Sequence, residues 1–252
     1  MGGKMWGYDC YNLRQYGVLD IQTFIDIGAT KGDASMMAMI LFPFARIVGI
    51  EPNKEYFTEL NRFSGKRFNF YNTALGDGLP MYFKSFGREG QGKFIPSKPE
   101  NDTYVVESKM LSQMFKDYNI NTDSHFILKC DCEGGEKALL KEWNQSLAII
   151  QKAIQFNIEI HIGAWNKKED WDKYLDVLRE THNIYIGDFI KDGKKKVKYF
   201  YSRFDNSLEE YGRGWINIMA QKRFRDFYDT DLYYNSLSPY WRWFCTEGKL
   251  WG

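Results

Sequence analysis

The chain has 252 residues, a formal net charge of +1 at pH 7 and 17% aromatic residues. This length suits one large α/β domain with a full hydrophobic core. A near-neutral charge lacks the basic excess of nucleic-acid-binding proteins, which argues against a nucleic-acid partner. The longest apolar run, residues 34–44, is too short to span a membrane, and residues 1–9 are not apolar. We therefore expect a cytoplasmic protein without a membrane span.

Three segments are expected along the chain. Residues 1–22 are aromatic and polar without a clear period, and they predict an N-terminal cap. Residues 23–224 are expected to form the main domain. Residues 225–252 form an aromatic tail that packs on this domain or on a neighbouring subunit, so a homo-oligomer held by the aromatic termini is one expectation.

From Phe24 onward, short β-rich runs alternate with helical runs, which is typical of a doubly wound α/β sheet with parallel strands. Strands are predicted at 24–27, 47–50, 68–72, 126–131, 154–161, 184–190 and 215–220. Helices are predicted at 33–42, 54–63, 108–118, from 132 through 143, and at 168–179. Between them, the pattern predicts a hairpin strand at 81–86, a binding loop or lid at 87–102 and a lysine-rich hairpin turn at 191–198.

Residues 24–33 read F-I-D-I-G-A-T-K-G-D, a buried strand that breaks into a glycine turn and enters a helix. Glu51 ends the second strand, 25 positions after Asp26, where a doubly wound fold hydrogen-bonds a ribose. A dinucleotide site has the pattern G-x-G-x-x-G, whereas this turn holds only Gly28 and Gly32. The pattern therefore favours S-adenosylmethionine, which has no phosphate, over NAD. An ordinary strand-to-helix turn is the alternative.

The roles expected at this site follow from the cofactor's groups. Gly28 leaves room for close backbone approach, and Asp26 or Asp33 meets the ammonium group directly or through water. Residues 72–77 are expected beside the adenine, with a tight turn as the alternative. The full set of expected cofactor-binding residues is Asp26, Gly28, Ala29, Gly32, Asp33, Glu51, Pro52, Asn72, Ala74 and Asp131.

Polar residues also gather at the carboxyl ends of the fourth and fifth strands, where ligands of open α/β sheets bind. A central parallel strand is normally apolar on both faces, and buried polar groups need partners. One face of the fifth strand nevertheless carries Gln155, Asn157, Glu159 and His161. A structural hydrogen-bond network and a substrate or metal site are both open interpretations.

On the fourth strand, Lys129 shares a face with Asp131 and Glu133, so Lys129 could pair with Asp131 for catalysis or only for architecture. The four cysteines follow no metal-binding spacing, and buried reduced thiols are expected. They are Cys10, Cys130, Cys132 and Cys245.

Four segments carry a family resemblance: F-I-D-I-G-A at 24–29, G-I-E-P-N at 49–53, N-T-A-L-G-D at 72–77 and L-K-C-D-C-E-G at 128–134. With them the chain resembles FkbM-type S-adenosylmethionine-dependent O-methyltransferases over about residues 24–222. The resemblance implies a Rossmann-like sheet of seven strands, the last antiparallel, and a hydroxyl acceptor on a sugar or natural product. Two departures are Thr30, where the family often has Asn, and Gly135, where Ala is usual.

From this resemblance we expect methylation of a sugar hydroxyl, nucleotide-linked or glycan-bound, in surface polysaccharide or capsule biosynthesis. One alternative is O-methylation of a polyketide or another secondary metabolite. A module that binds cofactor or glycan without turnover is the alternative from another class. A dehydrogenase is the weakest reading, because the third glycine is missing.

Methyl transfer to a hydroxyl needs positioning and a general base. His161 is the preferred base because it is the histidine that ends a central strand, and Asp131 is the second choice. The expected catalytic residues are therefore His161, Asp131 and Lys129. A Mg or Mn ion held by Asp131, Glu159 and His161 could instead acidify the hydroxyl.

Overall fold

The structure, a computed structural model, describes residues 20–85, 92–95, 103–162, 167–192, 195–203, 208 and 214–223. The expected cap (1–22) and aromatic tail (225–252) lie almost wholly outside these ranges, so both stay predictions, as does the oligomer contact. No helix within these ranges is both long and apolar enough to cross a membrane.

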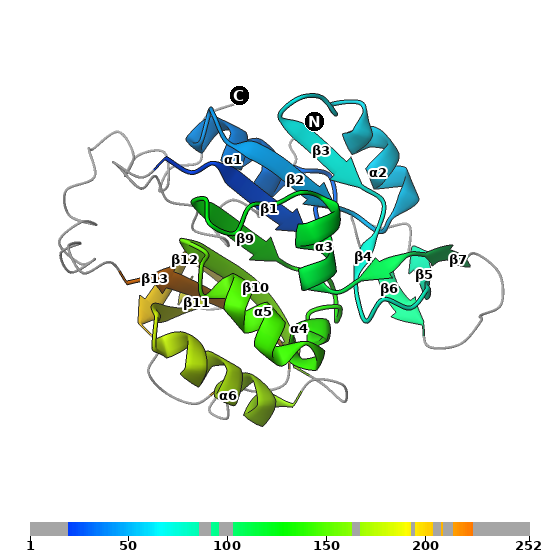
Figure 1. Ribbon diagram of the computed structural model, residues 1–252. Coiled ribbons are helices and arrows are strands. Elements are labelled where there is room, and N and C mark those ends of the chain that lie inside the picture. The colour runs from blue at the N-terminus through cyan, green and yellow to red at the C-terminus, as the bar shows by residue number, and fades with distance from the viewer. Residues whose placement is uncertain are drawn as a thin grey trace.

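An eight-stranded sheet forms the centre of the molecule (Figure 1). Its strands are β1 (Thr23–Ile27), β2 (Arg46–Ile50), β3 (Phe68–Tyr71), β9 (Phe126–Cys130), β10 (Gln155–Ile162), β11 (His182–Asp192), β12 (Lys195–Arg203) and β13 (Gly214–Lys222). Across the sheet they follow the order β12-β11-β13-β10-β9-β1-β2-β3. The chain therefore winds outward in both directions from β1 and β9, which makes their carboxyl ends the switch point where such sheets bind ligands.

The strand directions confirm the doubly wound, mostly parallel sheet. β1 pairs in parallel with β2 and β9, and parallel pairs also join β2 to β3 and β9 to β10. β13 runs antiparallel to both of its neighbours, β10 and β11. The seven predicted strands are all present, and the last is antiparallel as expected.

β12 is an eighth strand that the sequence reading missed. It pairs antiparallel with β11 at the edge of the sheet, and its residues 195–198 lie in the stretch predicted as a turn. The predicted turn over 191–198 was therefore too long. Lysine is common in edge strands, and the alternating Val197, Tyr199 and Tyr201 have high β-propensity.

Helices cover both faces of this sheet (Figure 1). They are α1 (Asp33–Leu41), α2 (Lys54–Asn61), α3 (Leu111–Asp117), α4 (Lys137–Lys141), α5 (Trp143–Ile150) and α6 (Lys168–Arg179). α1 packs in a cluster with Phe24 and Ile47. α3, α5 and α6 pack in the larger cluster that contains Ile25 and Phe156. Phe24 and Ile25 are successive residues of one strand and point to opposite faces, so the two clusters lie on opposite sides.

Two predicted helices differ in extent. The helix predicted at 108–118 begins at Leu111, because Ser108 and Lys109 form the short strand β8 (Ser108–Lys109). The helix predicted to end near Trp143 is two helices, since the backbone of Glu142 (φ −103, ψ 44) leaves the helical region between α4 and α5.

Two small sheets stand beside the main one. β8 pairs with β4 (Ala74–Leu75). The other sheet has the order β6-β5-β7, from β5 (Met81–Ser85), β6 (Gly92–Ile95) and β7 (Thr103–Val106). The predicted hairpin strand at 81–86 is confirmed. β6 lies within the predicted loop 87–102, whose other residues are not described.

Candidate functional site

The turn after β1 brings three strand ends together. Gly28 has a φ of 78°, and a Cβ built there would lie 1.7 Å from the carbonyl oxygen of Asp131, which follows β9. The amide of Gly28 donates to the carbonyl of Ile50 at the end of β2. The expectation that Gly28 leaves room for a cofactor is corrected accordingly, because the Asp131 carbonyl occupies that space. Gly28 allows the segments that follow β1 and β9 to lie close to each other.

The second glycine of the motif serves the helix. Gly32 caps the N-terminus of α1 with a φ of 86°, and a Cβ there would lie 2.6 Å from the Leu60 side chain. Asp33, in the first turn of α1, is exposed, whereas Ala29 is buried. Of the expected cofactor residues in this turn, Asp33 therefore offers the solvent-facing carboxylate.

Asp26 lies inside the protein and is fully buried. Its Oδ1 is 3.0 Å from Nζ of Lys129, and Ser35 Oγ donates to its Oδ2 at 2.7 Å. Lys129 also donates to the carbonyl of Gly28 at 2.6 Å. Burial lowers the pKa of Lys129, but the charges of Asp26 and Asp131 outweigh burial and raise it above its ordinary value.

Two expectations change as a result. The partner expected for Lys129 was Asp131, whose charge does act on it, but an ion pair also runs to Asp26, directly opposite Lys129 in the pairing of β1 with β9. A charged, buried Lys129 has no proton-accepting form, so its place is to hold the Gly28 turn. Asp26 is likewise taken up by that turn, with no exposed surface toward a ligand.

Glu51 stands at the end of β2 as expected, 4% exposed. Its Oε2 accepts from the amide of Thr30 at 2.7 Å and its Oε1 from the amide of Asn53 at 2.6 Å. Burial raises the pKa of Glu51 to about 7, against the lowering effect of these two hydrogen bonds. Because each carboxylate oxygen has a second lone pair, Glu51 can still accept hydrogen bonds from a ribose.

The neighbours of Glu51 hold its loop. Asn72 Nδ2 donates to the carbonyls of Glu51 and Pro52, at 2.9 and 3.1 Å. Tyr104 on β7 donates its hydroxyl to the Pro52 carbonyl at 3.1 Å and accepts from the amide of Lys54 at 2.9 Å. Ala74 is buried within β4. Residues 72–77 thus form a strand and turn, and Asn72 acts on the Glu51 loop.

A second group of polar side chains lies at the ends of β9 and β10. Ligand atoms of Asp131, Glu159 and His161 all lie within 4.8 Å of one another. The structure therefore brings together the three residues expected to hold a metal. The two carboxylates suit Mn²⁺ or Mg²⁺, whereas the imidazole suits these ions only loosely, so the residues fit the expected ion in part.

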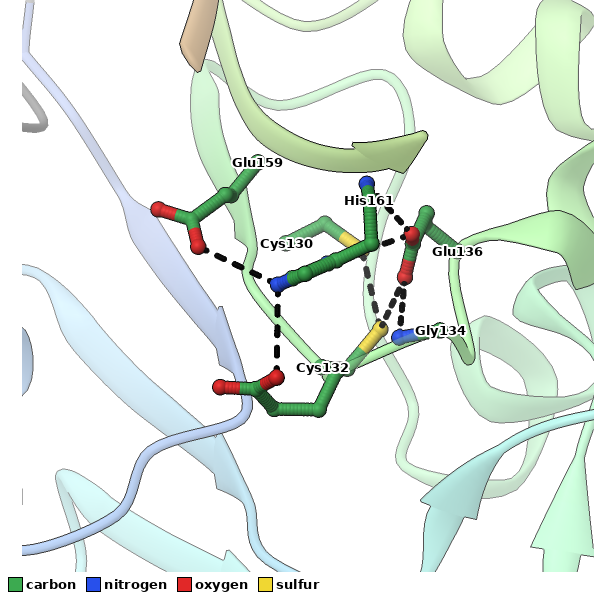
Figure 2. A network of polar contacts seen from close by, with 7 residues as sticks. Cys130, Cys132, Gly134, Glu136, Glu159 and His161 are labelled. Carbon is green, nitrogen blue, oxygen red and sulfur yellow. Dashed lines mark hydrogen bonds and ion pairs between the residues drawn. The ribbon is translucent and has the colours of Figure 1, made fainter. Parts of the chain in front are cut away.

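His161 is surrounded by carboxylates (Figure 2). Its Nε2 is 3.2 Å from Glu159 and 3.3 Å from Glu133, and its Nδ1 is 3.3 Å from Glu136. Burial lowers the pKa of His161, but the hydrogen bonds to Glu136 and Glu159 outweigh burial and raise it to about 11. The ring therefore carries a proton at neutral pH in this arrangement. An imidazolium cannot accept a proton, so this arrangement favours the second choice of base, Asp131, over His161.

Glu136 is a member of the site that sequence reasoning missed. Although fully buried, it accepts from the amide of His161 at 2.9 Å and from the amide of Gly134 at 2.8 Å. Its sequence position, just before a predicted helical run, marked it only as an acid near a helix start. Gly135 beside it explains one departure from the family pattern, since a Cβ there would lie 2.9 Å from the Leu75 carbonyl oxygen.

The polar row of β10 is only partly paired, since Nδ2 of the buried Asn157 finds no hydrogen-bond partner among the described residues. Gln155 donates to Asn157 at 3.0 Å, and both are buried. The alternate residues of the strand lie in the main core with α6. Gln155 and Asn157 belong to a structural network, whereas Glu159 and His161 belong to the cluster at the strand end.

Residues 26–185, more than half of the chain, match the Methyltransferase FkbM domain. A comparison with curated proteins finds no match. A solved methyltransferase FkbM from Methylobacillus flagellatus KT is 15% identical, with a TM-score of 0.44, over 81% of this chain and 45% of that one. The chain thus spans less than half of that protein.

Two further solved structures cover most of both chains. A precorrin-6y C5,15-methyltransferase from Geobacter metallireducens GS-15 is 13% identical, with a TM-score of 0.36, over 81% of this chain and 83% of that one. A putative rRNA methylase from Clostridium thermocellum is 10% identical, with a TM-score of 0.42, over 82% and 89%. Likeness at this level concerns the fold alone.

Proposed function

Because the chain belongs to the FkbM methyltransferase family and is an S-adenosylmethionine-dependent methyltransferase, we propose that it methylates a hydroxyl group of a sugar. The sugar is nucleotide-linked or bound in a glycan, and the reaction belongs to surface polysaccharide biosynthesis in the cytoplasm. One observation supports a hydroxyl acceptor: the cluster of Asp131, Glu159 and His161 at the switch point of the sheet. Carboxylates at this place can hydrogen-bond and deprotonate a weakly acidic alcohol.

The cofactor end of the proposed site is the Glu51 loop. S-adenosylmethionine supplies the electrophilic methyl group, and Glu51 supplies the acceptors for the ribose hydroxyls. Thr30 and Asn53 hold both carboxylate oxygens through backbone amides, so the carboxylate is oriented before a ligand arrives. Asp33 is the exposed carboxylate of the turn and the proposed partner of the ammonium group.

The acceptor end is the cluster after β9 and β10. The hydroxyl loses its proton as it attacks the methyl group, and a base must take up that proton. We assign this role to Asp131, because His161 is protonated in the absence of an ion, and in the presence of one its ring nitrogen would be a ligand. Asp131 follows β9 directly, and its backbone carbonyl lies against Gly28, which places it beside the cofactor turn.

A divalent Mg or Mn ion is part of the proposal. Asp131, Glu159 and His161 would hold it, with His161 as the neutral imidazole. An ion there would make the acceptor hydroxyl more acidic and orient it. A polyketide phenol, being more acidic, would need this ion less, so a metal requirement separates the sugar acceptor from the secondary-metabolite alternative.

The first test is calorimetric titration of the protein with S-adenosylhomocysteine, with NAD as the control ligand. We expect binding of S-adenosylhomocysteine alone, lost in Glu51→Ala. Methyl transfer from labelled S-adenosylmethionine to a panel of nucleotide sugars, with and without chelator, then tests the acceptor. Binding without transfer to any sugar or phenol would support a non-catalytic module. Transfer that survives loss of both Asp131 and His161 would refute the assigned chemistry.

A further inference from the structure

We propose that Glu133 is a fourth ligand of the divalent ion and that Glu136 is the residue that positions His161 toward it. This inference rests on the proposed ion at Asp131, Glu159 and His161. It adds one ligand and one positioning residue to that set. The ligand it commits to is Mn²⁺ or Mg²⁺, as expected for a site with three carboxylates and one imidazole.

The distances around His161 are those of neighbouring ligand atoms. Nε2 lies 3.2 Å from Oε1 of Glu159 and 3.3 Å from Oε2 of Glu133. In an octahedral site with bonds of about 2.1 Å, adjacent ligand atoms are about 3 Å apart. Glu133 lies outside the group whose ligand atoms are all within 4.8 Å of one another, so its carboxylate must move toward an ion held by Asp131, Glu159 and His161. Glu133 is also half exposed, so its carboxylate can follow the ion at little cost.

The negative charge of the cluster is larger than one proton can neutralise. Four carboxylates surround His161, those of Asp131, Glu133, Glu136 and Glu159. One proton on the imidazole offsets a single negative charge, and the nearby Lys129 already pairs with Asp26. A divalent cation bound by a neutral imidazole offsets two negative charges. The gain is large where several carboxylates share a partly buried site.

Glu136 differs from the other three carboxylates in its position. It is fully buried, and its Oε1 contacts both the amide and Nδ1 of His161, while its Oε2 accepts from the amide of Gly134 (Figure 2). These contacts leave Nε2 facing Glu133 and Glu159. A buried carboxylate on the far nitrogen is how proteins orient a metal-binding histidine.

A separate observation indicates a further ligand at the site. Asn217 on β13 pairs in register with Glu159, so both side chains lie on one face of the sheet. Asn217 is 2% exposed, and its Nδ2 finds no hydrogen-bond acceptor in the structure. A water or acceptor hydroxyl on the ion beside Glu159 would satisfy that amide.

The test is titration of the full chain with Mn²⁺, followed by electron paramagnetic resonance and calorimetry, without cofactor or acceptor. We expect one Mn²⁺ per chain, and about 10- to 100-fold weaker binding in Glu133→Gln. Glu180→Gln, at the far end of α6, removes an equivalent exposed carboxylate and should bind Mn²⁺ like the wild type. Unchanged Mn²⁺ affinity in Glu133→Gln would overturn the fourth ligand.

Glu136→Gln tests the positioning role. We expect a similar loss of Mn²⁺ affinity with unchanged binding of S-adenosylhomocysteine. Glu136→Asp, which keeps the charge, should recover part of the affinity and serves where the Gln variant does not fold. Lower stability with wild-type Mn²⁺ affinity would show a merely structural role. A wild type that binds S-adenosylhomocysteine but no Mn²⁺ overturns this inference and leaves methyl transfer standing, whereas failure to bind S-adenosylhomocysteine refutes the proposed function itself.

Discussion

At the scale of single residues, the site depends on a few backbone positions with unusual conformations. Gly28 and Gly32 flank the turn after β1, and Thr30 and Glu133 have positive φ values without being glycine. Non-glycine residues in this region cost about 1–3 kcal/mol each and concentrate at functional sites. Here they bring the Thr30 amide to Glu51 and the Glu133 carboxylate to His161.

Gly28→Ala should be strongly destabilising. A Cβ at 1.7 Å from the Asp131 carbonyl oxygen forces β1 and β9 apart, and the φ of 78° adds strain, so we expect a loss of about 3 kcal/mol or more in urea unfolding. Gly78→Ala is the matched control, because Gly78 has a similar φ of 85° with nothing within 4 Å of the built Cβ. That change should cost only about 1 kcal/mol. Equal losses in the two variants would contradict the steric argument.

At the scale of elements, the small sheet is attached to the cofactor loop. β7 contributes Tyr104, whose hydroxyl contacts both the Pro52 carbonyl and the Lys54 amide, on either side of Asn53. The loop that carries Glu51 is therefore supported from a different sheet. Tyr104 follows the predicted binding loop 87–102 and contacts the loop after Glu51, the acid that we propose binds the ribose.

Tyr104→Phe should weaken binding of S-adenosylhomocysteine by about five- to thirtyfold, the effect of losing one or two hydrogen bonds worth about 1 kcal/mol each. Tyr82→Phe, on the adjacent strand β5, is the control and should bind like the wild type. Calorimetry gives both affinities. Wild-type affinity in Tyr104→Phe would show that the small sheet does not support the cofactor loop.

At the scale of the whole molecule, buried titratable groups far from the switch point set part of the pH dependence of stability. His182, at the start of β11, is fully buried and contacts the Ala153 carbonyl through Nε2 at 3.0 Å. Burial lowers its pKa from 6.5 to about 4. The unfolded chain therefore binds a proton between these values that the folded protein does not, and stability falls as pH decreases from 6.5 to 4.

The size of this effect is roughly 3 kcal/mol, from 1.36 kcal/mol for each unit of pKa difference. Glu51 acts with the opposite sign between pH 4.5 and 7, since its raised pKa makes the folded protein hold the extra proton. We therefore expect the contribution of His182 to appear in the difference between the free energies of unfolding of the wild type and His182→Gln. Urea unfolding at pH 7 and pH 4.5 should show a smaller acid loss in the variant. Parallel profiles would contradict the assignment.

The sequence by itself determined the sheet, its switch point and the residues at the strand ends. Apolar runs separated by glycine turns depend on local chemistry, so β1, β2, β9 and β10 were predictable, as was the meeting of Asp131, Glu159 and His161. The edge strand β12 was missed because its lysines resemble a solvated turn.

Only the tertiary structure decided which charged side chains contact one another. Lys129 pairs across the sheet with Asp26, and Glu136 folds back onto His161, because strand register and the crossing at Gly28 set those distances. The protonation of His161 likewise depends on the tertiary structure. The pKa of His161 depends on carboxylates from two separate segments of the chain, and no pattern within one strand reveals how closely they approach.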